Sequence, residues 1–193
     1  MNNIKIREAS FPQDKKNLVA LVNEYFAWLE LPASHRGFEG EMSKIEIHYT
    51  LPSGFFLIAE VDGVLVGCVG LLAHDIQVAE IKRLYVRPSH RGHALGEMLM
   101  NAIIHKAQQF GFLKLILGAI PKTTMAQALY ARLGFSEASA FYEDPVEGTK
   151  FFQMALVLHH QGCLTIECNV DGNEACVCVS AIVHTKEAGN PLP

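Results

Sequence analysis

The sequence predicts an α/β protein whose central sheet is mixed, mostly antiparallel and flanked by helices. Half of the 193 residues are hydrophobic, which is ample for a packed core. Short apolar runs rich in strand-forming residues lie between longer segments whose apolar residues recur at helical spacing. The order is a strand, helices, a meander of strands, and then strand–helix–strand–helix–strand. This order favours one mixed sheet with helices on its faces.

The N-terminal segment is predicted to form a strand followed by a long helix. In residues 3–8, isoleucines alternate with basic residues, as in a strand. Ser10 and Gln13 have the spacing of a helix capping box, and Pro32 marks the end of the helix. The apolar face of this helix is formed by Leu18, Leu21, Val22, Tyr25, Phe26 and Leu29.

The next segments predict a loop, a short helix and a β-hairpin. Residues 33–42 are polar and contain glycines, so we expect a loop there, followed by a short helix over about 43–50. The runs at 55–61 and 64–73 are almost continuously apolar, as in strands of a sheet covered on both faces. The Asp-Gly pair at 62–63 is typical of a hairpin turn between them.

The central stretch, residues 78–99, is predicted to form a strand, a sharp turn and the start of a helix. Pro88 cannot donate a hydrogen bond to a β-ladder, so strand pairing should stop there. Gly111 stands where the C-terminal glycine of the helix belongs. The helical spacing is carried by Leu95, Met98, Leu99, Ala102 and Ile103.

Small residues and a cation stand at the start of this central helix. They are Arg91, Gly92, His93, Ala94 and Gly96. A helix start exposes free amide groups, small side chains let a phosphate approach the backbone, and the helix dipole favours negative charge. These features indicate a site for an anion such as a di- or polyphosphate. A tight connection that needs glycine only for its backbone angles is the alternative.

The rest of the chain predicts another strand, a helix, a loop and a final strand. The strand covers Leu113–Leu117, the helix closes at Gly134, the loop covers 136–148, and the last strand covers 149–158. Residues 159–193 have a different pattern, a hairpin-like extension around an Asp-Gly-Asn turn. We therefore expect a domain at residues 1–158 and a C-terminal extension of unknown role at 159–193.

Composition excludes several classes of protein. The formal net charge of −4 argues against binding nucleic acid or an anionic membrane through bulk charge. No apolar run approaches membrane-spanning length, and the N-terminus lacks the long apolar region of a signal peptide. The cysteines are odd in number, which indicates free thiols and a cytoplasmic location. They are Cys68, Cys163, Cys168, Cys176 and Cys178.

The stretch from Glu80 to Gly96 closely resembles the acetyl-CoA pyrophosphate loop of the GNAT-type N-acetyltransferases. That loop has Arg or Gln, two variable residues, Gly, one variable residue, and then Gly or Ala. Arg91 and Gly96 match it, whereas Ala94 replaces the usual glycine and adds a methyl group where the phosphate should lie. The resemblance covers about residues 3–158 and implies a GNAT fold, acetyl-CoA as cosubstrate and a homodimer. The implied cofactor-binding residues are Leu84, Val86, Arg91, Gly92, His93, Ala94, Leu95, Gly96 and Thr123.

A second GNAT signature is resembled by residues 126–135, Ala-Gln-Ala-Leu-Tyr-Ala-Arg-Leu-Gly-Phe. By this resemblance, Tyr130 lies near the sulfur of the cofactor and protonates the departing thiolate. A phenol is a hydrogen-bond donor at neutral pH, so the chemistry is reasonable. A tyrosine on an apolar helix face is otherwise more often a core residue. The family often has Asn where this chain has Thr123, which offers fewer hydrogen bonds.

The resemblance also suggests a general base and a bulge in the central strand. A carboxylate in this region, here Glu80, can deprotonate the amine directly or through water; a salt bridge with Lys82 or Arg83 is the alternative. The adjacent cations interrupt the apolar pattern, as a β-bulge does. The family splays this strand from its neighbour, so that the cofactor pairs with its backbone, here at Leu84 and Val86. Further candidates, which spacing cannot rank, are His48, His74 and Tyr142.

The acceptor amine is expected near the first helices and the loop after them. Candidate substrate-contacting residues there are Tyr25, Trp28 and His35, with Glu30 and Arg36 nearby. We expect the acceptor to be a small-molecule or peptide amine.

Other functions have weaker support in the sequence. A CoA-binding regulatory module without turnover remains an alternative, because Ala94 and Thr123 depart from the family pattern. A nucleotide-binding domain lacks both glycine-rich fingerprints, and a serine hydrolase lacks its elbow motif. We expect no metal. A zinc site would need ligands without a Cys-x-x-Cys pair, from His159, His160, Cys163, Cys168, Cys176 and Cys178.

Overall fold

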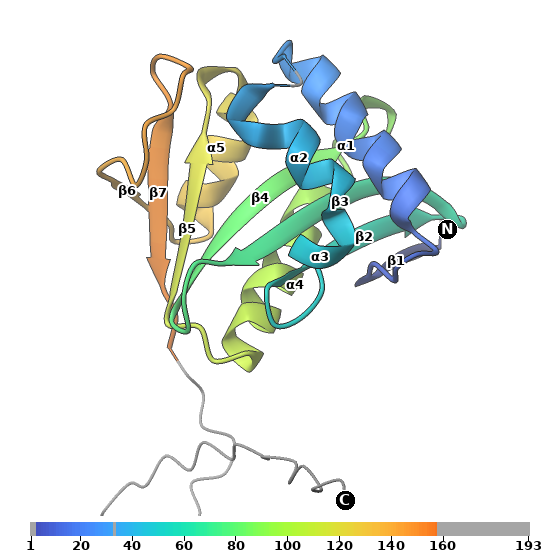
Figure 1. Cartoon of the computed structure of the whole chain (residues 1–193), viewed down its shortest axis with the longest axis horizontal. Coiled ribbons are helices and arrows are strands. Elements are labelled where there is room, and N and C mark those ends of the chain that lie inside the picture. The colour runs from blue at the N-terminus through green and yellow to red at the C-terminus, as the bar shows by residue number, and fades with distance from the viewer. Residues whose placement is uncertain (1–2, 33, 158–193) are drawn as a thin grey trace, which may run out of the picture. The chain divides into compact units, whose positions relative to one another are not determined.

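The computed structural model describes residues 3–32 and 34–157. Within them the strands form one sheet in the order β1-β2-β3-β4-β5-β7-β6 (Figure 1). All neighbouring strands pair antiparallel except β4 and β5, so the predicted mixed, mostly antiparallel sheet is confirmed. The strands are β1 (Ile4–Glu8), β2 (Gly54–Val61), β3 (Val64–Ala73), β4 (Val78–Val86), β5 (Lys114–Ala119), β6 (Ser136–Ala138) and β7 (Lys150–Ala155).

Helices cover both faces of this sheet. Helices α1, α2 and α3 lie on one face and α4 on the other, while α5 lies beside β5 (Figure 1). The α-helices are α1 (Lys15–Leu29), α2 (Phe38–Ser43), α3 (Ile45–His48), α4 (Leu95–Gln109) and α5 (Thr124–Arg132). Short 3-10 turns precede α2, α4 and α5, and they are η1 (His35–Gly37), η2 (Pro88–His90) and η3 (Pro121–Thr123).

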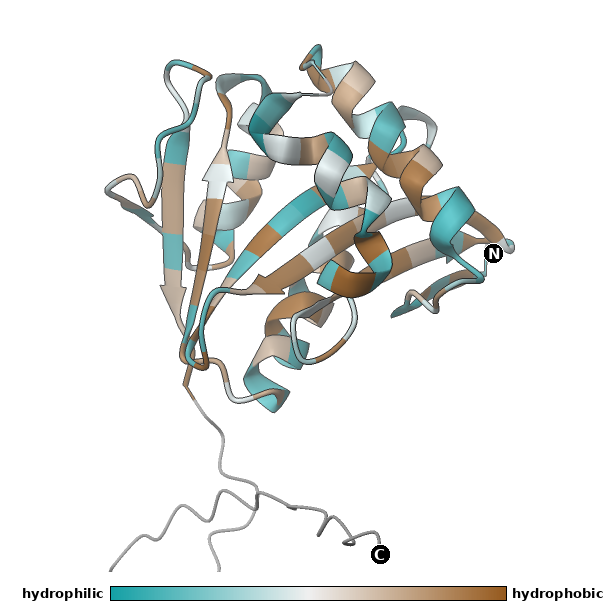
Figure 2. Cartoon of the chain, in the orientation of Figure 1, coloured by the Kyte–Doolittle hydropathy of each residue, from teal (hydrophilic) through white to brown (hydrophobic). Residues whose placement is uncertain are grey.

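Strand β2 explains why its sequence is apolar at almost every position. Phe56 and Ile58 pack in a core with α1, α2 and α3, whereas Phe55 and Leu57 pack in a second core with α4 and α5. The apolar strands β2 and β3 accordingly run through the middle of the domain (Figure 2). The turn at 62–63 also forms as expected, with both residues at positive φ.

The start of α1 differs from the prediction. The helix begins at Lys15, not directly after Ser10, and no side chain caps it. The carboxylate of Asp14 instead accepts hydrogen bonds from the guanidinium of Arg7, at 2.6 and 2.9 Å, and from the Ser10 amide, at 2.7 Å. A contact with β1 therefore outweighs the local capping box formed by Ser10 and Gln13.

Two predicted loops contain regular structure. Residues 33–42 include η1 and most of α2, because Phe38 and Met42 pack into the core on the α1 face. Residues 136–148 include the short strand β6, which pairs with β7 at the edge of the sheet. Both segments are too short and too polar for their periodicity to be seen in the sequence.

Strand β4 carries a bulge at the adjacent cations that interrupt its apolar pattern. Cys68 of β3 lies opposite Tyr85 and Gly70 lies opposite Lys82, so that Arg83 and Leu84 share one place in the register. Arg83 has a φ of 60°, in the left-handed region. The interruption of the apolar pattern by two cations therefore coincides with a real bulge.

Beyond the start of β4, the two parallel strands separate. Their ladder joins Val78–Glu80 to residues 114–116 of β5 and extends no further in the described residues. The remaining parts of β4 and β5 diverge towards the end where α1 and α5 lie (Figure 1). This splay opens the sheet between α1 and α5.

Candidate active site

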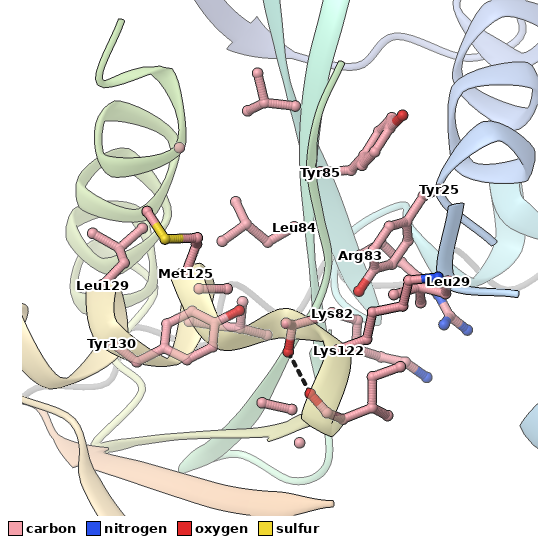
Figure 3. Close-up of a pocket in the computed structure, with 18 of the residues that line it drawn as sticks. Tyr25, Leu29, Lys82, Arg83, Leu84, Tyr85, Lys122, Met125, Leu129 and Tyr130 are labelled. Carbon is pink, nitrogen blue, oxygen red and sulfur yellow. Dashed lines mark hydrogen bonds between the residues drawn. The ribbon is translucent and has the colours of Figure 1, made fainter. Parts of the chain in front are cut away.

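A cavity of about 440 Å³ occupies the splay between β4 and β5 (Figure 3). It is bordered by α1 and η1 on one side and by α5 and the first turn of α4 on the other. Of the site residues predicted from sequence, all except His93 line it. Those that do are Tyr25, Trp28, His35, Glu80, Leu84, Val86, Arg91, Gly92, Ala94, Leu95, Gly96, Thr123 and Tyr130.

The loop before α4 presents a row of free amides to this cavity. The first hydrogen bond of the helix runs from the Met98 amide to the Ala94 carbonyl, at 2.9 Å. Among the described residues, no backbone carbonyl accepts from the amides of residues 92–97. Arg91 to Ala94 are exposed, so nothing in the described chain covers this loop. Unpaired amides at a helix start form a suitable site for a phosphate.

Backbone conformation and a cation–π contact shape the same loop. Gly92 and Ala94 both have positive φ, 82° and 57°, and only the glycine accepts this without steric strain. The Arg91 side chain donates a hydrogen bond from Nε to the Val86 carbonyl at 2.9 Å, and its guanidinium lies 4.6 Å from the centre of the Trp28 ring. Arg91 therefore fastens the loop to β4 and α1.

Tyr130 lies on α5 and faces the cavity. Its hydroxyl and that of Tyr25 on α1 point towards the space between the two helices (Figure 3). Tyr130 is 7% exposed, and burial raises its pKa above the ordinary value for a phenol. The group is consequently protonated at neutral pH and able to donate a hydrogen bond.

Thr123 precedes α5 and also lines the cavity. Its hydroxyl donates a hydrogen bond to the Ile120 carbonyl at 2.8 Å within η3. Its hydroxyl oxygen can still accept a hydrogen bond from a ligand. Its role as a cofactor-binding residue stays a prediction.

Glu80 stands at the fork, where the β4–β5 ladder ends. It is 4% exposed, and its two carboxylate oxygens lie 3.2 Å from the Tyr142 hydroxyl and 3.2 Å from Nε2 of His74. A Cβ at Gly118 of β5 would collide with the Tyr142 hydroxyl, so the glycine leaves room for this contact. His74 is half-exposed, so the buried carboxylate has a titratable neighbour that reaches solvent.

The structure thereby ranks the unranked candidates. Tyr142 lines the cavity and, like His74, contacts Glu80, whereas His48 on α3 is not among the lining residues. The alternative for Glu80, a salt bridge with its sequence neighbours Lys82 or Arg83, is not what the structure shows. Both of those cations pair with Glu41 of α2.

Glu41 holds the bulge of β4 in place. Its carboxylate accepts hydrogen bonds from Arg83 at 2.7 and 3.2 Å, from Lys82 at 3.0 Å and from the Tyr49 hydroxyl at 2.6 Å. Burial acts to raise the pKa of Glu41, but the charges of Arg83 and Lys82 outweigh it and lower the pKa to about 2. Sequence reasoning missed Glu41, which lies in a segment predicted to be a loop.

The cavity wall next to α1 is largely aromatic. Tyr25 packs against Tyr85 with ring centres 5.3 Å apart and lies 6.3 Å from Trp28. Burial raises the pKa of Tyr25 to about 12. His35 is 9% exposed, and burial lowers its pKa, which favours a neutral imidazole at neutral pH.

Arg36 and Asp144 also line the cavity. Arg36 was noted in the sequence only as a neighbour of the expected acceptor site, and Asp144 carried no functional signal. They belong to segments that are distant in sequence, and only the tertiary fold brings Arg36 to both Glu80 and Asp144.

The splayed sheet and the row of free amides that faces its cleft place the chain among mixed α/β proteins with a cleft open at a helix start. Residues 19–135 match the model of the acetyltransferase (GNAT) family. This chain therefore belongs to the GNAT acetyltransferase family, as the sequence resemblance indicated.

Individual relatives agree with this assignment. The chain is 28% identical over 159 residues to an uncharacterised N-acetyltransferase of Schizosaccharomyces pombe, which covers 80% of this chain and 96% of the relative. A GNAT-family acetyltransferase of Staphylococcus aureus has the same fold, with a TM-score of 0.69 and 23% identity over 80% of this chain and all of that one. An N-acetyltransferase of Thermoplasma acidophilum solved with coenzyme A matches with a TM-score of 0.64 and 20% identity, covering 80% and 99% of the two chains.

Among residues 3–32 and 34–157, no helix has both the length and the apolar character that crossing a membrane needs.

Proposed function

We propose that this protein transfers an acetyl group from acetyl-CoA to the primary amine of a small molecule or peptide, by direct attack in a ternary complex. The observation that carries the proposal is the cavity in the splay, which has free amides at one end and buried acid–base groups at the other. Coenzyme A bound to the Thermoplasma relative supports the choice of carrier.

The residues present fit a CoA molecule. The free amides of residues 92–97, with the positive end of the α4 dipole, suit its pyrophosphate. The splayed part of β4, with Leu84 and Val86, has no partner on the β5 side and can pair with an extended amide chain. Bound acetyl-CoA supplies the activated acyl group: the amine nitrogen bonds to the carbonyl carbon as the carbon–sulfur bond breaks.

Two protein groups manage the protons of this reaction. Glu80 takes a proton from the acceptor ammonium, and His74 offers it a path to solvent. Tyr130 donates its phenolic proton to the departing thiolate, and the buried setting keeps that proton in place until then. No covalent enzyme intermediate is needed. These roles stay predictions that rest on geometry.

Release of free thiol from acetyl-CoA, measured with a panel of polyamines, aminoglycosides, amino acids and peptides, tests the proposal. We expect release that depends on both acetyl-CoA and an amine, with the acetylated amine identified by mass spectrometry. If the protein binds acetyl-CoA tightly but never releases thiol, it is instead a CoA-binding regulatory module. The homodimer and the cytoplasmic location expected from the resemblance are tested by light scattering and by cell fractionation.

A further inference from the structure

Arg36 occupies an unusual position in the acceptor half of the cavity. It lies in η1 with φ 48° and ψ 38°, in the left-handed region that non-glycine residues rarely adopt. Its Cζ atom lies over the Tyr142 ring, 3.5 Å from the ring centre, and the side chain is 27% exposed. The fold therefore holds a cation against an aromatic ring in the wall of the cavity.

Neither carboxylate beside Arg36 uses its hydrogen-bond donors. Its nitrogens lie 3.8 Å from Glu80 and 3.7 Å from Asp144, beyond hydrogen-bond distance. Arg83, in the same cavity wall, makes close bonds of 2.7 and 3.2 Å to Glu41. Arg83 is therefore committed to Glu41, whereas Arg36 makes no close hydrogen bond to a carboxylate, so that N–H groups of its planar fork can serve a ligand.

The two carboxylates beside Arg36 are also fixed in place. Those of Glu80 and Asp144 are 6% and 5% exposed. One oxygen of Asp144 accepts the Val146 amide at 2.9 Å, which leaves the other directed at Arg36. The cavity thus presents a negative, a positive and a negative group in sequence, each within 4 Å of the next.

We propose that the acceptor is an amino acid with a free α-carboxylate, held by Arg36, while its α-amino group lies against Glu80 and Asp144. An α-amino acid carries opposite charges on adjacent carbons, which matches the alternation of charge in the cavity. Guanidinium binds a carboxylate in a bidentate geometry that a simple amine cannot use. This inference rests on the proposed function and specifies its acceptor. Phe26, Leu29 and Leu31 line the same cavity and offer the side chain of the amino acid an apolar surface.

Matched acceptors test the role of the carboxylate. L-leucine, L-leucinamide and 3-methylbutylamine share an amine and a side chain. Leucine carries a free carboxylate, leucinamide carries a carboxamide in its place, and 3-methylbutylamine carries neither. We expect kcat/KM for leucine to exceed that for the other two by about 10- to 100-fold, the range of a charge-assisted bidentate pair. Testing the other amino acids against their carboxamides extends the comparison to other side chains. Carboxamides that match or exceed the free acids throughout would overturn the inference.

Variants of Arg36 test whether this residue makes the distinction. In Arg36→Gln the ratio of kcat/KM for leucine to that for leucinamide should fall to about 1. Arg36→Lys keeps the charge but loses the planar guanidinium, so it should retain part of the preference for leucine. Arg132→Gln is the matched control: Arg132 lines the same cavity on the α5 side, and this variant should keep the wild-type ratio. A ratio that survives in Arg36→Gln contradicts the assignment.

Calorimetry provides a readout that does not depend on turnover. Leucine and leucinamide are titrated into the wild-type protein saturated with CoA, and leucine should bind at least about tenfold more tightly. Transfer to carboxylate-free amines alone would end the inference and leave the proposed acetyltransferase intact. Absence of transfer to every amine would end the proposed function, and selective binding of leucine would then still identify the carboxylate site.

Discussion

The two halves of the cavity are built in different ways. The half proposed to bind the cofactor offers main-chain amides from one continuous stretch, residues 92–97, and depends little on which side chains surround it. The half proposed to bind the acceptor offers side chains from η1, β4 and the 142–144 loop, and its charges must be positioned by the whole fold. Backbone recognition suits a constant ligand, whereas a side-chain cluster can change with the acceptor.

The largest effect on activity should come from removing the Tyr130 hydroxyl. Tyr130→Phe removes one hydroxyl and keeps the ring packed between Phe135 and Phe152. If Tyr130 protonates the thiolate, kcat should fall by about 100- to 10,000-fold. CoA affinity should change little. Steady-state kinetics and calorimetry measure the two quantities, and an unchanged kcat would remove Tyr130 from the mechanism.

A smaller effect is expected where α2 supports the bulge. Glu41→Gln leaves Arg83 and Lys82 buried without a counter-charge, so the free energy of unfolding at pH 7 should fall by about 3 kcal/mol. Because the folded pKa lies below the unfolded value, the carboxylate stabilises the fold above pH 4.5 and loses this effect as the pH falls towards 2. The difference between wild type and variant should shrink over that window.

Urea denaturation at several pH values measures this difference. Glu46→Gln is the control, because Glu46 pairs with Lys15 at the surface with 41% of its side chain exposed, and the change should cost well under 1 kcal/mol. A loss in Glu41→Gln that does not vary with pH would show that packing, rather than charge, holds the bulge.

The smallest effect is expected at Ala94, which replaces the usual glycine of the family loop. Ala94 has a φ of 57°, so Ala94→Gly should relieve strain and stabilise the protein by about 0.5–1 kcal/mol. The substitution should also tighten CoA binding, because it clears the approach to the amides. Thermal unfolding and calorimetry measure both.

The same substitution at Ala102, inside α4, serves as the control for this change. Ala102→Gly lies within α4, where the same substitution should destabilise the protein by about 1 kcal/mol. Destabilisation in both variants would mean that the left-handed geometry of Ala94 carries no strain.

Sequence reasoning succeeded where the signal is local. The strand, turn and glycine pattern before α4 requires only neighbouring residues, and the apolar runs of β2 and β3 identify a sheet that is covered on both faces. It failed where a distant partner decides. Helix α1 does not begin after Ser10 as predicted, because the carboxylate of Asp14 binds Arg7 of β1. The links from Arg36 to Glu80 and Asp144 span segments far apart in the chain, so no spacing could reveal them.

The extra residue in β4 also inverts which side of the sheet each later side chain occupies. Before the bulge, Ala79 and Ile81 pack on the α4 side; after it, Leu84 packs there instead, and Tyr85 packs against α1. Odd and even positions have exchanged roles. Strict alternation would send adjacent cations to opposite faces, yet Lys82 and Arg83 reach one carboxylate. Deleting Arg83 would remove the bulge and still leave Tyr85 opposite Cys68 on its present side, whereas straightening the strand without a deletion would carry the Tyr85 phenol into the opposite core.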